Sequence, residues 1–514
     1  MTTTWTPGEP LPDAVASSAL FTSWFRPAGD GRDATGELAG AARAIASPAP
    51  APWFADRAAQ AWAGRLAADL PDDAARQRLD ANLAALRAGR ADVVVTGQQP
   101  GFLGGPLLTV HKIATAVALA RQLSAAGRPT IPVFWSGDDD DDLVEAFEPA
   151  AWAGGAGLVR SELREAARRG GAARRRLGTL GVREGQEAAL AWLAAQREGS
   201  LAFATWAEAA DGRWRWADLQ RRALLRMFAG TDLVIVSGDD PDLHAAGAPF
   251  YAEVRPKLAA LADAARTRGQ ALAAAGFHAQ IGERSLARPL FAAAGDRRVA
   301  ADPGTADRDL RPGVLLRSAL QDWLLRPRAV VVGPGEYAYL RQLAPVYAAL
   351  GLERAPLVPR LFGWLLPDGF DRARLAEHRR VDAGPPLDDA AWRAWQDGAA
   401  ASLASLLEHA GGLPAERAAA LARGRLKRWR RGVDAAVRHE RRSAAMARVP
   451  RDPAWIFPGG LRQERGVAWG AAWAAWGADL APALVGAAGA HLAAGAANDW
   501  REWIITVPAP EEPR

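Results

Sequence analysis

The chain has 514 residues, of which 49% are hydrophobic and 24% are charged, so it can bury a large core and is too long for one ordinary domain. It has no cysteines, which excludes disulfides, thiolate catalysis and cysteine-ligated metals. No signal peptide and no uninterrupted apolar run of about 18 residues is visible, so we expect a cytoplasmic protein without a membrane span.

The net charge of +5 allows two interpretations. Basic and acidic residues are nearly equal in number, at 63 and 58, and the basic ones are scattered. This pattern favours an arginine-rich surface. The alternative is a face that binds nucleic acid, motivated by one dense basic cluster at 423–431. We do not expect nucleic acid as a partner.

The first predicted strand and the loop that follows it form the centre of the chain. Helices are predicted over 53–90, and the β-branched run 91–95 then predicts a strand. The glycine-rich stretch 96–106 separates it from a second helix, and Pro106 suits the first turn of that helix. The loop and the helix N-terminus offer free N–H groups, so this order is suited to binding an anion.

Further strands alternate with helices along the chain. An arginine-rich helical insertion is expected over 143–230, a hairpin near 290–299, and a break at Pro345 in the helix that ends at Leu350. The remaining predicted strands are 131–135, 233–236, 329–332, the extended piece 356–361, and 503–507. A helical segment, with a coiled coil as one interpretation, covers 368–449; it lies between a core at 1–367 and a C-terminal segment at 450–514.

This alternation predicts an α/β fold with a parallel sheet and helices on both of its faces. In such sheets ligands bind beyond the carboxyl ends of the strands. Four unusual loops follow predicted strands, and we expect them to converge on one crevice: 96–106, 136–142, 237–241 and 333–336.

Five consecutive aspartates, Asp138 to Asp142, follow the second strand. They could bind Mg²⁺ or a substrate amine, or they could form a solvated turn that caps a helix, and the sequence leaves both interpretations open. No histidine pair has the spacing of a zinc site and no P-loop is present, so no metal ligands are assigned. Of the seven histidines, His111 is the best candidate for function because it lies close to the glycine-rich loop.

Several of these motifs together resemble one family, the bacillithiol biosynthesis cysteine-adding enzymes. The most specific block runs from Val95 to Gly101 and continues through Gly105-Pro106 to His111-Lys112. The other matching blocks are Pro132–Trp135 with its acidic loop, Val314–Arg317 with Gln321-Asp322, Gly333–Glu336 with Tyr339, Val358–Arg360, Pro458–Gly460 and Gln463–Arg465.

The resemblance implies a Rossmann-like core and a helical coiled coil that mediates a homodimer. It also implies a ligase that joins cysteine to the amine of glucosaminyl malate, with ATP as the expected co-substrate and Mg²⁺ as a candidate ion. Whether activation passes through an adenylate or an acyl phosphate stays open. Class I aminoacyl-tRNA synthetases share this architecture, and their nucleotide-binding histidines suggest a similar part for His111 by analogy.

On this basis the candidate site residues fall into three groups. The expected nucleotide contacts are Thr96, Gly97, Gln98, Gln99, Gly333, Gly335 and Glu336. The expected catalytic residues are His111, Lys112, Asp139, Asp140 and Asp142. The expected substrate contacts are Asp138, Asp141, Arg317, Gln321, Asp322 and Arg360.

One departure from the family pattern bears on the substrate. Family members carry Glu-Asp-His-Asp after the second strand, whereas this chain has Asp139 to Asp142, so Asp141 replaces the histidine. This change motivates a second hypothesis, a related ligase with a different amino acid or amine acceptor. A third hypothesis is a non-catalytic nucleotide-binding protein.

Overall fold

The computed structural model describes residues 4–11, 19–26, 33–43, 51–56, 58–153, 157–168, 175–196, 198–375, 389–426, 429, 455–458 and 461–509. The chain forms two compact units, one of Met1–Asp368 with Ala454–Arg514 and one of Gly369–Pro453. Parts of two sequence motifs lie outside the described residues, namely 427–428 and 430–431 of the basic cluster and the glycines at 459–460.

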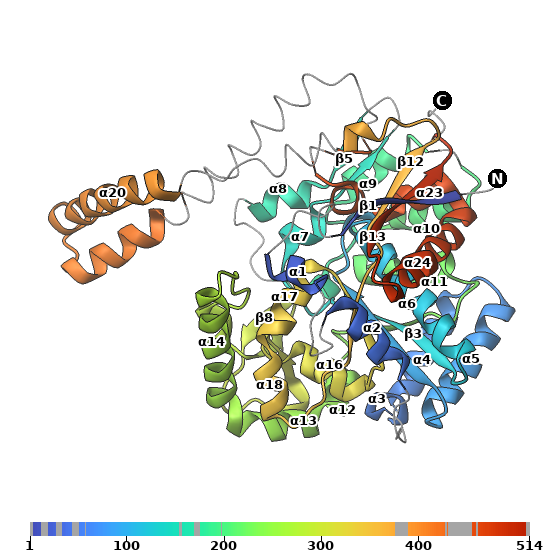
Figure 1. Cartoon of the computed structure of the whole chain (residues 1–514), viewed down its shortest axis with the longest axis horizontal. Coiled ribbons are helices and arrows are strands. Elements are labelled where there is room, and N and C mark those ends of the chain that lie inside the picture. Colours follow the sequence, from blue (N-terminus) through green and yellow to red (C-terminus); the bar gives the residue numbers. More distant parts are fainter. Residues whose placement is uncertain are drawn as a thin grey trace. The chain divides into compact units, whose positions relative to one another are not determined.

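A five-stranded, all-parallel sheet forms the centre of the first unit, as the alternation of strands and helices predicts. Figure 1 labels its strand β3 among the surrounding helices. Its order is β11-β10-β2-β3-β6. The strands are β2 Asp92–Gln98, β3 Thr130–Ser136, β6 Val234–Ser237, β10 Ala329–Val332 and β11 Leu357–Pro359. Most of their residues are buried, because both faces of the sheet are covered.

The strand order reverses between β2 and β10. From β2 the chain adds β3 and then β6 on one side, and it later returns to add β10 and β11 on the other. Val94 and Val95 lie opposite Ala329 and Val330, and the Thr96 hydroxyl donates to the Val331 carbonyl oxygen at 2.9 Å. The carboxyl ends of β2 and β10 therefore frame the point where a ligand crevice is expected.

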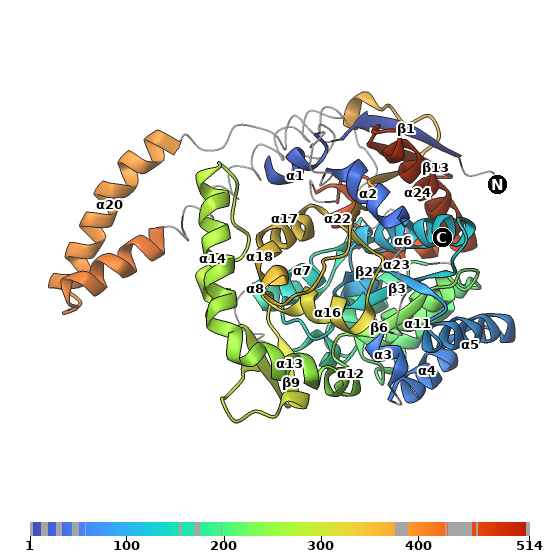
Figure 2. The same ribbon diagram turned by 60° about the horizontal axis from the view of Figure 1, so that its bottom comes forward.

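The helix α6 (Leu108–Ala125) packs against β2, β3 and β10, and α24 (Leu480–Ala496) packs against α6 (Figure 2). Nearly all of α6 is buried, which includes the polar residues His111 and Lys112. Pro106 lies before the helix rather than in its first turn, because Leu107 is the N-cap.

Other helices surround this core. Before β2 they are α1 Ala19–Trp24, α2 Ala34–Ala42, α3 Pro52–Ala55, α4 Ala58–Asp69 and α5 Asp73–Arg87. Between β3 and β6 they are α7 Leu143–Phe147, α8 Glu162–Arg168, α9 Gln186–Leu193, α10 Leu201–Ala207 and α11 Trp216–Met227, together with the strands β4 Ala150–Trp152 and β5 Leu158–Arg160. After β6 they are α12 Pro241–Ala246, α13 Ala248–Val254, α14 Leu258–Ala274, α15 Glu283–Leu286, α16 Arg317–Leu325, α17 Pro334–Gln342 and α18 Ala344–Ala349.

Two local predictions are confirmed in this last region. The hairpin consists of β7 Leu290–Ala294 and β8 Arg297–Ala300, and β9 Leu310–Pro312 extends it to three strands. The expected break near Pro345 separates α17 from α18.

A second sheet joins the two ends of the first unit. The strand β13 (Arg501–Val507) pairs with β12 (Gly363–Pro367) in parallel and with β1 (Thr4–Pro10) in antiparallel orientation. The sequence predicts β13 but not β1, because Pro7, Gly8 and Pro10 oppose a strand. After β12 and the second unit, the chain returns through α22 Gln463–Gly466 and α23 Trp469–Trp476.

The described part of the second unit is helical. It contains α20 (Asp389–His409) and a further helical stretch over 415–426, with no strand among its described residues. Across the described residues of both units, no helix is long and apolar enough to cross a membrane.

Candidate active site

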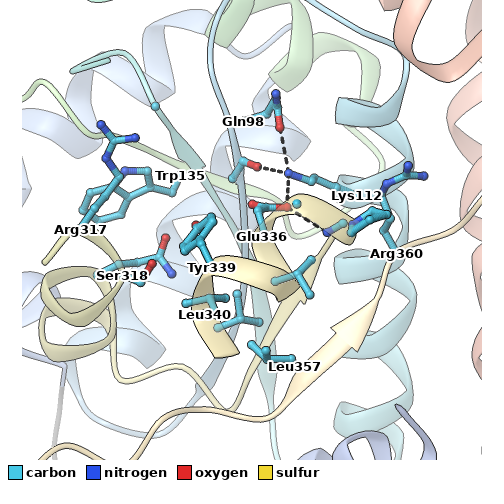
Figure 3. A pocket seen from close by; sticks show the side chains of 18 of the residues that line it. Gln98, Lys112, Trp135, Arg317, Ser318, Glu336, Tyr339, Leu340, Leu357 and Arg360 are labelled. Carbon is cyan, nitrogen blue, oxygen red and sulfur yellow. Dashed lines mark hydrogen bonds and ion pairs between the residues drawn. The ribbon is translucent and has the colours of Figure 1, made fainter. Parts of the chain in front are cut away.

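A cavity of about 340 Å³ lies where the strand order reverses (Figure 3). Eleven of the sequence-predicted site residues line it: Gly97, Gln98, Gln99, Lys112, Arg317, Gln321, Asp322, Gly333, Gly335, Glu336 and Arg360. Gln98 and Lys112 lie at one end in Figure 3, and Leu340 and Leu357 lie at the other. Of the four loops that we expect to converge, those after β2, β3 and β10 contribute lining residues, the loop after β3 through Gly137 alone. The loop 237–241 after β6 is not among the lining segments, so this part of the prediction is wrong.

The Lys112 ammonium is buried and fully occupied. It donates to the Gly97 carbonyl oxygen at 2.7 Å and to Gln98 Oε1 at 2.8 Å, and its Nζ lies 2.6 Å from Glu336 Oε2 (Figure 3). Burial lowers the pKa of Lys112, although Glu336 acts in the opposite direction. With three acceptors for three protons, the Lys112 ammonium has no donor left for a phosphate.

Besides its contact with Lys112, Glu336 caps the N-terminus of α17. Its Oε2 accepts from the Gly333 N–H at 2.9 Å, which completes a capping interaction across the first turn. Gly335 lies at the cavity edge with open space: apart from its chain neighbours and the nearby backbone of α17, no heavy atom of the described residues lies within 4 Å of the position that a Cβ would take. The protein's own carboxylate therefore already partners the positive end of this helix.

Arg360 follows β11 and forms a buried ion pair with Glu464 of α22. Its two terminal nitrogens each lie 2.8 Å from one carboxylate oxygen, and Nη1 also donates to the Leu361 carbonyl at 2.7 Å. Burial alone would raise the pKa of Glu464, but Arg360 and Arg462 hold that pKa well below its ordinary value. This bidentate pair connects the C-terminal segment to the wall of the cavity.

At the side of the cavity formed by α16, Arg317 connects the cavity to the aspartate loop. Its Nη1 donates to Asp140 Oδ2 at 2.9 Å, and its Nη2 lies 3.5 Å from Asp139 Oδ2. Burial would raise the pKa of Asp140, but Arg317 and Arg298 keep it well below its ordinary value. Gln99 also donates to Asp140 at 3.2 Å, so this carboxylate fixes two of the lining side chains.

Asp322 lies on the cavity wall and accepts from the Tyr347 hydroxyl at 2.9 Å. Burial raises the pKa of Asp322 to about 6, against the opposing effects of Tyr347 and Gln321. This carboxyl group therefore titrates close to neutral pH.

The five aspartates themselves do not line the cavity. Asp138 is buried and accepts from the Ser237 hydroxyl at 2.6 Å and the Asp239 N–H at 2.9 Å, and Asp141 lies 4.0 Å from Arg298. Asp142 accepts from the Glu145 N–H at 3.0 Å and caps α7, so for this aspartate the structure agrees with the interpretation of the run as a turn that caps a helix. Asp139 and Asp140 instead partner Arg317, and among the described residues no group of three or more His, Asp or Glu is placed to hold a metal ion.

His111 is also not on the cavity wall. Its ring is fully buried, and Nδ1 lies 4.0 Å from Glu464 Oε2. Among the residues that the structure describes, neither ring nitrogen has a hydrogen-bond partner. Burial lowers its pKa to about 3, so the ring is neutral at physiological pH. The structure therefore places His111 in the core and gives no support to its expected contact with a nucleotide.

The glycine-rich loop after Gln99 is not an anion cradle. A Cβ on Gly101 would lie 1.9 Å from the Ala146 carbonyl oxygen, and one on Gly104 would lie 2.1 Å from the Trp469 ring. The Leu107 N–H at the start of α6 donates to the Val467 carbonyl at 2.8 Å. These glycines allow close packing of protein on protein, and the α6 N-terminus is covered. Thr96 is likewise buried, and its hydroxyl joins β2 to β10 rather than facing a ligand.

Several lining residues are not among the predicted site residues. Trp135 lies in β3 and in a quoted family block, and Gly137 follows β3 in the predicted loop 136–142. Glu145 follows the Asp142 cap with the spacing of a capping box, which could have located it. The further polar lining residues are Gln280, Ser318, Tyr339, Tyr347, Arg354 and Arg465, of which Tyr339 and Arg465 belong to the quoted family blocks.

Comparison with known proteins assigns the family. Residues 65–308 and 303–361 match the model of the bacillithiol biosynthesis BshC N-terminal Rossmann-like domain, which together is more than half of the chain. The chain belongs to the BshC family. The matched region contains the five-stranded sheet of this BshC family member and all but one of its cavity-lining residues, the exception being Arg465.

Similar curated proteins carry the name "Putative cysteine ligase BshC". The chain is 31% identical over 324 residues to that of Koribacter versatilis, which covers 56% of this chain and 57% of that protein. It is 29% identical to that of Geobacillus kaustophilus (55% and 57% covered) and 26% identical to that of Shouchella clausii (58% and 59% covered). The chain thus spans little more than half the length of the curated relatives it matches.

Proposed function

We propose that this BshC family member is a cysteine ligase of bacillithiol synthesis, which joins the carboxyl group of cysteine to the amine of glucosaminyl malate. The observation that carries the proposal is that residues from separate family blocks, among them Gln98, Lys112, Glu336 and Arg360, line one polar cavity at the strand-order reversal. The names of the similar proteins support the same assignment.

ATP is part of this proposal, because a carboxylate must acquire a better leaving group before an amine can displace it. The amides of Gln98 and Gln99 and the open space at Gly335 suit a polar co-substrate. Since Glu336 holds both Lys112 and the Gly333 N–H, a phosphate group must displace that carboxylate or bind elsewhere on the wall. We include Mg²⁺ only as an ion that enters with the phosphates.

Fixed charges and dipoles around the cavity would supply the main catalytic effect by stabilising the charge that develops on the reacting carboxyl group. Arg317 and Arg360 are each locked by a carboxylate, so their positions are set before substrate arrives. We further propose that the protein acts in the cytoplasm and as a homodimer through its helical segment, which sedimentation of the full chain would test.

The direct test is to incubate the purified full-length protein with cysteine, ATP and glucosaminyl malate and to follow the thiol product by mass. We expect product only when all three are present. A panel of other amino acids and amine acceptors, followed by ATP consumption, addresses the related-ligase hypothesis. Turnover with another pair and none with cysteine and glucosaminyl malate would overturn the assignment.

A further inference from the structure

The charged side chains that line the cavity differ in whether the protein already neutralises them. Most are engaged: Lys112 with Glu336, Arg317 with Asp140, Arg354 with Glu37, Arg360 with Glu464, and Asp322 with the Tyr347 hydroxyl. Within the described part of the chain, the side chains of Glu145 and Arg465 form no ion pair or hydrogen bond. These two charges are therefore the ones available to a ligand.

Glu145 and Arg465 also lie at the rim of the cavity. Most other lining residues are buried or half-buried, whereas these two are exposed together with Gln280 and Gly335. Their charged groups are therefore more open to solvent than those of Lys112 and Asp322, which are buried.

Both charges stand on anchored backbone. The Glu145 N–H donates to the Asp142 cap, and the next residue, Ala146, packs directly on Gly101 of the β2 loop. Arg465 follows Gln463, whose side chain exchanges hydrogen bonds of 2.7 and 2.8 Å with the Leu365 backbone. The two free side chains are thus presented from fixed positions, as a binding site requires.

The surroundings of Glu145 make its carboxylate suitable as a proton acceptor. The pKa of Glu145 is raised, first because the surrounding protein displaces water and then because Asp142 lies near. Arg465 and Lys112 act in the opposite direction, and Asp140 adds a smaller upward effect. An ionised carboxylate with a raised pKa is a better base than an ordinary surface glutamate.

We propose that Glu145 binds the primary amine of the acceptor at the cavity rim and takes its proton as the amide bond forms, with Arg465 as the neighbour that keeps the carboxylate ionised. This inference rests on the proposed ligase function and adds a residue to it. Two neutral amide side chains that are not assigned to the co-substrate, Gln280 and Gln321, line the same cavity and could hold the hydroxyl groups of an amino sugar.

The step balances as follows. The bound ammonium first loses one proton to water, and the neutral amine nitrogen then forms a bond to the carbonyl carbon of an amino acid that a nucleoside triphosphate has activated. The bond from that carbon to the phosphate-bearing oxygen breaks, and its electron pair leaves on that oxygen. Glu145 receives the proton that the nitrogen loses.

The test compares the full-length protein with three variants, Glu145→Gln, Arg465→Gln and the control Glu162→Gln, which alters an exposed glutamate in the first turn of α8. In wild type we expect kcat/KM to rise with pH as Glu145 ionises. Glu145→Gln should lower kcat by about 100-fold or more and remove that limb. Arg465→Gln should move the limb to higher pH, because it removes a charge that favours the carboxylate. Glu162→Gln should match wild type.

A binding measurement separates this inference from the proposed function. Calorimetry should show that wild type binds glucosaminyl malate more tightly than the analogue with a hydroxyl in place of the amine, and that Glu145→Gln loses this preference. Equal binding of the two compounds by wild type overturns the inference even if the ligase is active. A wild-type preference for the amine that Glu145→Gln abolishes supports it even if no product forms.

Discussion

Replacing Glu464 by glutamine tests how the C-terminal segment is joined to the core. The substitution keeps the shape of the side chain and removes the charge that faces Arg360. Both partners are almost completely buried, with side-chain exposures of 1% for Arg360 and 3% for Glu464. A guanidinium in this position then has no counter-charge and little water.

Removing one partner of a buried ion pair destabilises a protein by about 3–5 kcal/mol, because the remaining charge is left uncompensated. Arg462, whose Nε lies 3.4 Å from Glu464, adds a second cation to the same place and supports the upper part of that range. By contrast, the pair of Lys257 and Glu253 is exposed, at 41% and 52%, so Glu253→Gln should change stability by less than about 0.5 kcal/mol.

Urea unfolding monitored by tryptophan fluorescence measures the difference between the two variants. A double variant, Arg360→Met with Glu464→Leu, should be closer to wild type than Glu464→Gln, because it removes the Arg360 charge together with its partner. The cation that remains, Arg462, still lies 3.6 Å from Glu502. The folded pKa of Glu464 is depressed, so its contribution is present above its ordinary value of 4.5 and is lost as the pH falls through the folded pKa. If Glu464→Gln and Glu253→Gln unfold at the same urea concentration, the ion pair does not stabilise this junction.

Three further variants test the site. His111→Phe should keep ligase activity, and a 100-fold loss would instead restore a catalytic role for His111. In wild type the His111 pKa of about 3 lies below the ordinary 6.5, so the free energy of unfolding decreases as the pH falls below 6.5. His111→Phe should remove this part of the acid dependence, up to about 1.4 kcal/mol per pH unit in urea unfolding. Gly104→Ala should destabilise by about 2–5 kcal/mol through its clash with Trp469 and its positive φ, while Gly335→Ala should unfold like wild type. Lys112→Met should destabilise the protein by about 1–3 kcal/mol and abolish product formation, since three acceptors lose their donor. Unchanged turnover would show that the contacts of Lys112 are not needed for the reaction.

The sheet could be predicted from the sequence because its signals are local. Runs such as Val93–Val95 and Val330–Val332 are apolar and β-branched, and each is followed at once by a polar loop. Since parallel strands place their carboxyl ends at one edge, the meeting of Gln98 with Gly333 and Glu336 followed without any knowledge of strand order.

The roles of glycine and histidine could not be predicted in the same way. A glycine that admits a phosphate and a glycine that admits an indole ring look alike in sequence, and Gly104 proves to be the second kind because Trp469 returns to it from far along the chain. The sequence favours His111 only because it lies close to the loop along the chain. On a helix, however, the adjacent residues His111 and Lys112 point in different directions, and only Lys112 faces the cavity.

Arg465 and Gln280 show a second limit. They reach the cavity from segments that no spacing rule connects to β2 or β10. Arg465 is marked in the sequence only by the family block Gln463–Arg465. No sequence pattern marks Gln280 as a site residue, because its neighbour Ile281 is positioned by two long-range hydrogen bonds with Gln342.

The order of the chain has a consequence for its synthesis on the ribosome. Arg360 is made before the second unit, whereas its partner Glu464 and the rim residue Arg465 are made after it, and Thr4 of β1 must wait for Thr506 of β13. The nascent chain therefore carries the Arg360 guanidinium without its carboxylate while the second unit is made, and it carries the strand β1 without its neighbour for most of translation. Closure of the cavity is therefore a late event of high contact order, and chains released before about residue 460 are expected to be substrates for chaperones and proteases rather than partially active enzymes.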